Sequence, residues 1–210
     1  NMIDLAVARN QPFFAFLHYW DPHTPYLPPL PFERMFYTGD ECDPNNHSMD
    51  PVYDCEPFKY YFMQWMCKPD PSDPDNIQKK RLWTDIHYVN SQYDASIAYM
   101  DACLSTLFQY LENQRILDDT LLIITADHGE ELDEHKLWYD HHGLYQTNCH
   151  VPLIVHCPDA VQPQRLNGIV TLKDIVPTIL DYTGKSDLIE REKIEGKSLR
   201  KIIESLSLIH

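Results

Sequence analysis

Two polar motifs, each placed directly after an apolar run, carry the residue types that could do chemistry. One is Asp127-His128-Gly129, which follows the leucine-rich and β-branched run of residues 120–125. Adjacent carboxylate and imidazole groups can bind one divalent cation, and the glycine lets the backbone turn away. Further residues of metal-ligand type follow closely: Glu134, His135, Asp140, His141 and His142. This density favours a cation site at Asp127 and His128 over a helix cap with solvated histidines.

The second motif, Asp21-Pro22-His23-Thr24-Pro25-Tyr26, comes directly after the apolar run of residues 12–18. If both apolar runs are parallel strands of one sheet, His23 emerges at the same sheet edge as the cation motif. There it would be a general acid or a partner for a negatively charged oxygen. A histidine in a proline-rich turn can also be no more than a turn residue.

The apolar patterns predict the elements that must position these motifs. Residues 12–18 are typical of a buried strand, with His18 as a core histidine. Residues 120–125 are apolar without alternation, which is typical of a central parallel strand covered on both faces. A further strand is expected over 151–156, and helical spacing predicts helices over 83–114, 173–182 (ending before Gly184) and 198–209. Strands and helices in this order indicate an α/β fold.

The segment 27–76 differs in composition from its surroundings. Eleven of the sixteen prolines lie between positions 22 and 74, and nine acidic but only two basic residues lie between 39 and 76. These features predict a long irregular insertion with a short helix around 58–66. Loops of this length are usually lids, binding loops or linkers. Its aromatic residues are too many for a disordered tether, so we expect it to fold over another part of the chain.

The composition narrows the classes of function. The 210 residues suffice for one large domain, and 17 Lys+Arg against 32 Asp+Glu give a net charge of −15. This balance argues against nucleic-acid binding and against docking on an anionic membrane, and no apolar run has the length of a membrane span. The six cysteines form no C-x-x-C pair. No signal-peptide pattern is visible at the first residues, and the compartment stays open.

The ordered motifs together resemble the sulfatase family of the alkaline-phosphatase-like superfamily. The resemblance rests on residues 12–18, 21–26, 121–132, 134–145 and 151–155, and on the segment Asp174-Ile-Val-Pro-Thr with Gly196-Lys-Ser-Leu199. It implies an α/β sandwich with a mostly parallel or mixed central sheet flanked by helices. Residues 1–210 would then be one portion of a single catalytic domain, with the acidic insertion at about 27–76.

The resemblance also implies roles for five residues. Asp127 and His128 match the pair that holds the active-site cation, usually Ca²⁺, with Mn²⁺, Mg²⁺ and Zn²⁺ as alternatives. His23 matches a histidine that contacts the sulfate and helps to protonate the leaving oxygen. His141 falls near a position that contacts the sulfate or the leaving group, and His142 is one residue away, so either could be the site residue.

The chain departs from the family at the nucleophile. Sulfatases use a formylglycine made within a C-x-P-S-R or S-x-P-S-R motif, and Cys67-Lys68-Pro69 imitates only its first and third positions. The formylglycine and the first-strand metal ligands are therefore expected outside this segment, in a missing N-terminal part of the same protein that would be its partner. This chain alone would be inactive.

The reaction implied by the resemblance is hydrolysis of a small-molecule or glycan sulfate monoester. Two alternatives remain: a phosphodiesterase or phosphonate monoester hydrolase of the same superfamily, and a non-catalytic metal-binding remnant. A threonine in the nucleophile segment would favour phosphoryl transfer.

Overall fold

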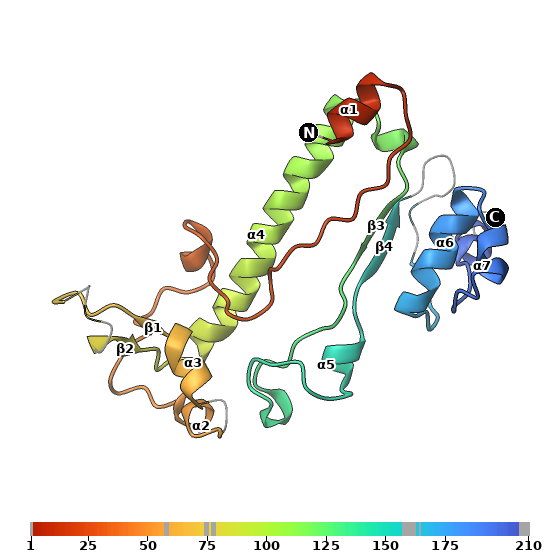
Figure 1. Cartoon of the computed structure of the whole chain (residues 1–210). Helices are drawn as coiled ribbons and strands as arrows, with labels where there is room; N and C mark the ends of the chain where they lie inside the picture. The colour runs from red at the N-terminus through yellow and green to blue at the C-terminus, as the bar shows by residue number, and fades with distance from the viewer. Residues whose placement is uncertain are drawn as a thin grey trace. The chain divides into compact units, whose positions relative to one another are not determined.

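The computed structural model describes residues 2–56, 59–73, 76, 79–156, 163 and 165–205 (Figure 1). The chain divides into two compact units, the first made of Asn1–Gln109 with Glu130–Leu144 and the second of Tyr110–Gly129 with Tyr145–His210. No helix among the described residues is long and apolar enough to cross a membrane.

The first unit contains short elements and one long helix. Its elements are α1 (Met2–Ala8), the 3₁₀ turn Phe32–Arg34, α2 (Asp50–Tyr53), α3 (Lys59–Trp65), β1 (Cys67–Lys68), β2 (Arg81–Leu82), most of α4 (Ile86–Asn113) and the 3₁₀ turn Glu134–Lys136. Strands β1 and β2 pair antiparallel. The helix expected around 58–66 is confirmed as α3, although Phe58 lies outside the described residues.

Helix α4 confirms the helix predicted over 83–114, and polar groups define its bounds. The Asp85 carboxylate accepts a hydrogen bond from the His87 backbone N–H at 3.0 Å, and the Ser48 hydroxyl accepts one from Ile86 N–H at 2.9 Å. These bonds satisfy N–H groups that a helix leaves unpaired in its first turn. At the other end Arg115 adopts a φ of 57°, and Ile116 N–H bonds back to the carbonyl of Leu111. This left-handed residue ends the helix.

The core of the first unit is aromatic, and the 27–76 insertion supplies much of it. Phe62 and Trp65 of α3 are buried, as are Tyr26 before the insertion and Trp83 and Tyr88 after it. Neighbouring rings meet edge to face, as aromatic pairs prefer. The insertion is therefore a packed part of the fold, as its aromatic content indicates.

An ion-pair network anchors the insertion to α4. The nearly buried Glu41 accepts hydrogen bonds from Arg34, at 2.6 Å, and contacts the Lys68 ammonium. Lys68 also bonds to Glu33, which accepts a bond from the Tyr88 hydroxyl of α4. Burial alone would raise the pKa of the Glu41 carboxyl, but these two cations outweigh it and lower the pKa to about 2.

The second unit is built on a two-stranded antiparallel ribbon. Strand β3 (Leu122–Thr125) pairs with β4 (Leu153–His156), with Ile123 opposite Val155 (Figure 1). The expected strands at 120–125 and 151–156 are confirmed, but the parallel pairing was wrong for this pair. Both strand pairs of the described residues are antiparallel, and β3 is half-buried rather than fully covered. The sequence pattern reports apolarity on both faces but not the direction of the neighbour. The α/β class is confirmed, and the full sandwich stays a prediction.

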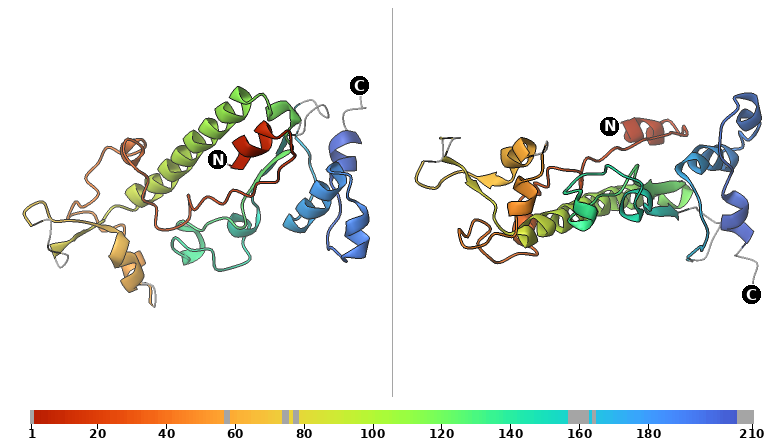
Figure 2. Two further views of the ribbon diagram at one scale, coloured as in Figure 1. Left: turned by 45° about the horizontal axis from the view of Figure 1, so that its top comes forward. Right: turned by 90° about the horizontal axis from the view of Figure 1, so that it is seen from below.

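The strand predicted over residues 12–18 was wrong. These residues follow α1 as an extended trace without a strand partner among the described residues (Figure 2). Phe14 and Phe16 are 76% and 80% exposed, and His18 is exposed rather than a core histidine. A strand exists only where a neighbouring backbone accepts and donates its hydrogen bonds, and local composition does not encode that neighbour.

Short helices close the second unit, which contains η3 (Leu117–Asp119), α5 (Gln146–Cys149), η5 (Leu172–Asp174), α6 (Ile175–Tyr182), α7 (Asp187–Arg191) and α8 (Arg200–Ser205). The helix expected over 173–182 is confirmed, and Gly184 follows it at a φ of 68°. Helix α8 covers the first part of the segment expected at 198–209, and residues 206–209 lie outside the described residues.

The motif around Asp174 and Gly196 is structural. The Asp174 carboxylate accepts bonds from the backbone N–H groups of Thr171 and Lys197, both at 2.8 Å. A side chain at Gly196 would lie 2.2 Å from the carbonyl oxygen of Lys173, so only glycine allows the two segments to approach. This motif joins α6 to α8 and takes no part in chemistry.

Candidate active site

In the second unit, β3 ends directly before Asp127 and His128. The Asp127 side chain is exposed, and its Oδ1 accepts the backbone N–H of His128 at 3.1 Å. The His128 Nδ1 lies 2.7 Å from the carbonyl oxygen of Gly129. A carbonyl only accepts, so Nδ1 carries the proton and Nε2 keeps the lone pair of the neutral ring. Metal-binding histidines are commonly oriented in this way.

The distance between the two donor atoms also suits a shared cation. Asp127 Oδ1 and His128 Nε2 lie 3.8 Å apart. Two ligands each about 2.0–2.4 Å from one ion span such a distance at an open angle. Carboxylate oxygen suits Ca²⁺, Mg²⁺ and Mn²⁺, whereas imidazole suits Zn²⁺ and other transition metals. The residues therefore fit a divalent cation.

Gly129 fixes the course of the chain after the cation motif. Its N–H bonds to the carbonyl of Asn148 at 2.8 Å, and a Cβ at this position would lie 1.8 Å from the carbonyl oxygen of Thr147. A side chain here must displace backbone. The motif thus needs glycine because the 145–150 segment passes directly against it.

In the first unit, His23 and His141 lie together. Their ring centroids are 5.1 Å apart with an interplanar angle of 60°. The His23 Nδ1 lies 2.7 Å from the carbonyl oxygen of Thr24, so this nitrogen carries the proton and Nε2 the lone pair of the neutral ring. The Trp20 ring packs on His23 at 4.4 Å. Two half-buried imidazoles in contact are suited to bind an anion or to transfer a proton.

A short hairpin brings His141 to this position. Glu131 N–H bonds to the carbonyl of Asp140 at 3.0 Å, and Tyr139 N–H bonds to the carbonyl of Leu132 at 3.3 Å. The loop between these bonds contains three non-glycine residues with positive φ, namely His135, Lys136 and Tyr139. Backbone strain of this kind persists only where the surroundings enforce it.

The other histidines of the cluster occupy different surroundings. The His142 side chain is 68% exposed and contacts the Asp140 carboxylate, whereas that of His141 is 33% exposed. His135 Nδ1 lies 2.9 Å from Oε2 of the fully buried Glu131. His135 therefore belongs to the hairpin's internal contacts, while His141 is the one that meets His23.

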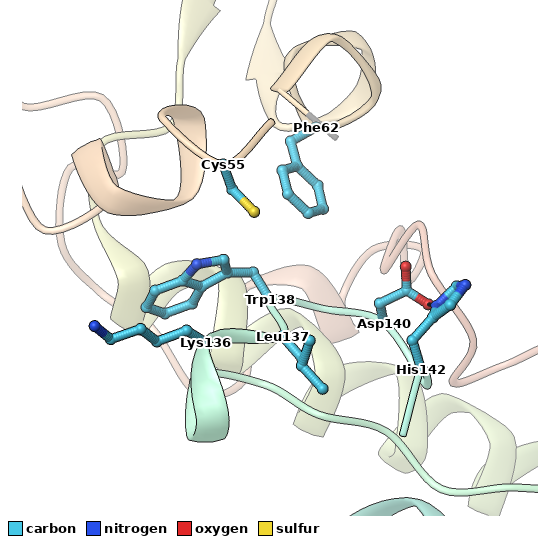
Figure 3. A pocket seen from close by; sticks show the side chains of 7 residues that line it. All are labelled: Cys55, Phe62, Lys136, Leu137, Trp138, Asp140 and His142. Atoms are coloured by element: carbon cyan, nitrogen blue, oxygen red, sulfur yellow. Dashed lines mark hydrogen bonds and ion pairs between the residues drawn. The ribbon is translucent and has the colours of Figure 1, made fainter. Parts of the chain in front are cut away.

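A hollow of about 270 Å³, partly open to solvent, lies between the insertion and this hairpin. Figure 3 shows Cys55 and Phe62 of the insertion facing Leu137 and Trp138, with Asp140 and His142 side by side at one end and Lys136 at the other. The Phe62 ring also meets Tyr139 edge to face, at a centroid distance of 6.3 Å. The insertion thus folds over the hairpin that carries His141.

Sequence reasoning missed the residues that hold the histidine pair in place. Tyr26 and Tyr139 are fully buried, and Glu130 is 8% exposed. Burial, and then the nearby Glu130 carboxylate, raises the pKa of the Tyr26 phenol well above its usual range. The available signal was that a tyrosine stands close to each histidine, three residues after His23 and two before His141.

Comparisons with known proteins agree with the motif order. The Sulfatase family model matches residues 1–185. Arylsulfatase K of Gallus gallus is 29% identical over 186 residues, covering 84% of this chain and 33% of that protein. The multifunctional alkaline phosphatase superfamily protein PehA of Trinickia caryophylli is 28% identical over 191 residues, covering 83% of this chain and 35% of that protein.

Among solved structures, the phosphonate monoester hydrolase SpPMH from Silicibacter pomeroyi matches with a TM-score of 0.68 and 23% identity, covering 97% of this chain and 40% of that one. At this identity the likeness shows the fold alone. The chain spans about a third of the length of the curated relatives that it matches. Since the family model covers most of the chain, this protein belongs to the sulfatase family of alkaline-phosphatase-like hydrolases.

Proposed function

We propose that the protein is a sulfuric ester hydrolase that cleaves a sulfate monoester with a divalent cation held by Asp127 and His128. The observation that carries the proposal is the orientation of His128. Its Nδ1 is engaged with the Gly129 carbonyl, and its Nε2 stands 3.8 Å from the Asp127 carboxylate. Membership of the sulfatase family supports the choice of sulfate esters.

The two residue pairs have separate tasks in this proposal. Asp127 and His128 hold the cation, which when bound supplies positive charge that polarises the sulfate oxygens. His23 and His141 contact the sulfate and its ester oxygen, and one of them donates a proton to the leaving alcohol. The net reaction converts a sulfate monoester and water into an alcohol and hydrogen sulfate.

Local charge has to attract the substrate, since the chain as a whole carries −15. A cation and protonated imidazoles provide a positive site within an acidic protein. This chain has no C-x-P-S-R or S-x-P-S-R motif, so the proposal gives its residues the tasks of cation binding and leaving-group contact. The formylglycine nucleophile is proposed to come from the rest of the protein.

The test is a comparison of substrates with the full-length protein. The values of kcat/KM are measured for 4-nitrophenyl sulfate, 4-nitrophenyl phenylphosphonate and bis(4-nitrophenyl) phosphate, with Ca²⁺ or Mn²⁺ present. The proposal expects the sulfate to be the best substrate. A preference for the phosphonate or the diester would assign the protein to the phosphorus esters. Cation binding without turnover of any substrate would identify a non-catalytic protein.

A further inference from the structure

We propose that Glu130 is the positioning residue of His141, holding the imidazole in the orientation that proton donation to the leaving oxygen requires. This inference rests on the proposed function and extends it to a residue with no assigned task. All the groups involved lie within the first unit of the chain.

The hairpin places the two residues opposite each other. Glu131 and Asp140 form an antiparallel bridge, and the bond from Tyr139 to Leu132 continues the same pairing. In an antiparallel pair the next residues outward are again opposite, so this register sets Glu130 against His141. Glu130 Oε1 lies 3.7 Å from His141 Nδ1, which is a charge contact rather than a hydrogen bond.

The burial of Glu130 makes this contact stronger than one at the surface. Its side chain is only 4% exposed, whereas that of His141 is 33% exposed. A carboxylate removed from water interacts strongly with a nearby polar ring, because little solvent screens it. The carboxylate is in turn held beside the Tyr26 phenol. Tyr26 is itself fixed by Trp65 and Tyr93, with ring centroids at 5.6 and 5.3 Å.

Asp140 is a weaker candidate for the same task. Its Oδ1 is also 3.7 Å from His141 Nδ1, but that oxygen accepts the backbone N–H of His141 at 2.7 Å and contacts the His142 ring. Asp140 therefore holds the backbone and the neighbouring histidine. The side chain that approaches the His141 ring from the buried side is Glu130.

The consequence for the reaction is specific to the leaving group. A proton donor matters greatly when the leaving alcohol is a poor leaving group and little when it is a stabilised phenolate. Loss of a residue that only positions the donor typically costs about 10–100-fold. Loss of general folding stability would instead lower the rate for both kinds of ester equally.

The experiment compares Glu130→Gln with Asp133→Asn, an exposed residue of the same hairpin, in the full-length protein. We expect Glu130→Gln to lower kcat on an alkyl sulfate about 10–100-fold, with a much smaller loss on 4-nitrophenyl sulfate and little change in KM. Asp133→Asn should leave both rates unchanged. Equal losses of Glu130→Gln on both esters, or no loss, would overturn the inference.

A second readout separates this inference from the proposed function. In ¹H–¹⁵N spectra of the histidine rings, Glu130→Gln should shift and broaden the His141 signals, while those of His135 should stay in place. Unchanged His141 signals would overturn the inference even if the protein hydrolyses sulfate esters. Shifted signals in a protein without sulfatase activity would overturn the proposed function, and the catalytic part of the inference with it. If Glu130→Gln does not fold, Glu130→Asp gives the same comparison.

Discussion

Tyr26 and Tyr139 pack edge to face, with their ring centroids 6.0 Å apart. Tyr26 stands three residues after His23, and Tyr139 stands two residues before His141. Since both tyrosines are fully buried, this contact ties together the two loops that carry the histidine pair. The spacing of His23 and His141 thus depends on an aromatic core that lies outside the motifs themselves.

The aromatic core predicts the effect of removing Phe62, which is 1% exposed and packs on Tyr139. We expect Phe62→Ala to lower the free energy of unfolding by about 3–5 kcal/mol. Urea denaturation followed by tyrosine and tryptophan fluorescence measures it. The matched control is Tyr60→Ala on the same helix, because Tyr60 is 70% exposed and should change stability little. Equal losses in both variants would show that α3 does not pack as described.

The cation site predicts a difference between two residues of the same loop region. Asp127→Ala removes a proposed ligand and should weaken Ca²⁺ or Mn²⁺ binding by at least about 100-fold, as measured by isothermal titration calorimetry. His135→Ala should change that affinity little, because His135 pairs with Glu131 instead. Equal weakening by the two substitutions would mean that the ligand assignment is wrong.

The histidine pair predicts which of two adjacent histidines serves the reaction. His141 contacts His23, whereas the largely exposed His142 contacts Asp140. His141→Ala should lower kcat/KM for an alkyl sulfate by about 10²–10⁴-fold, and His142→Ala by less than about tenfold. Steady-state kinetics of the full-length variants measures both. The reverse order would move the site residue to His142.

The glycine after the cation motif predicts a steric effect with a clean control. Gly129→Ala puts a Cβ 1.8 Å from a backbone oxygen, so the variant should lose at least about 2 kcal/mol of stability and bind the cation more weakly. Gly168→Ala meets no atom within 4 Å and should be close to neutral. Thermal unfolding and cation titration of both variants give the answer. A neutral Gly129→Ala would contradict the close approach of residues 147–148.

The buried Glu41 predicts a loss of stability in acid. Its folded pKa is lowered from 4.5 to about 2 by Arg34 and Lys68, which outweigh the effect of burial. A group with a lowered pKa stabilises the fold above its unfolded pKa, and this contribution fades as the pH falls from about 4.5 towards 2. Its size at neutral pH is about 3 kcal/mol, from the shift in pKa.

Urea unfolding at several values of pH measures this contribution. Glu41→Gln should flatten the decline of stability between pH 5 and pH 2, whereas Glu56→Gln, at an exposed position, should leave the decline as it is. Identical pH profiles for the wild type and Glu41→Gln would exclude the network as the cause.

Local pattern predicted those elements that local contacts build. Helices α4 and α6 follow from apolar spacing and from the capping residues at their ends. The strand at 12–18 did not follow, since the partner of a strand is set by distant chain. The antiparallel pairing of β3 with β4 was missed for the same reason.

The candidate site was predictable in its residue types but not in its supports. Asp127 and His128 stand out because they are polar and follow an apolar run. Glu130, Tyr26 and Tyr139 carry no such signal, because a buried glutamate or tyrosine looks like an exposed one until its burial is known. That His23 shares a sheet edge with the cation motif remains a prediction.

The most direct test of the central claim is release of inorganic sulfate from an alkyl sulfate by the full-length protein, compared with its Asp127→Asn variant. The account predicts stoichiometric sulfate and alcohol from the wild type, dependence on added divalent cation, and a rate at least about 100-fold lower in the variant. A wild type that releases no sulfate, or a variant as fast as the wild type, would contradict it.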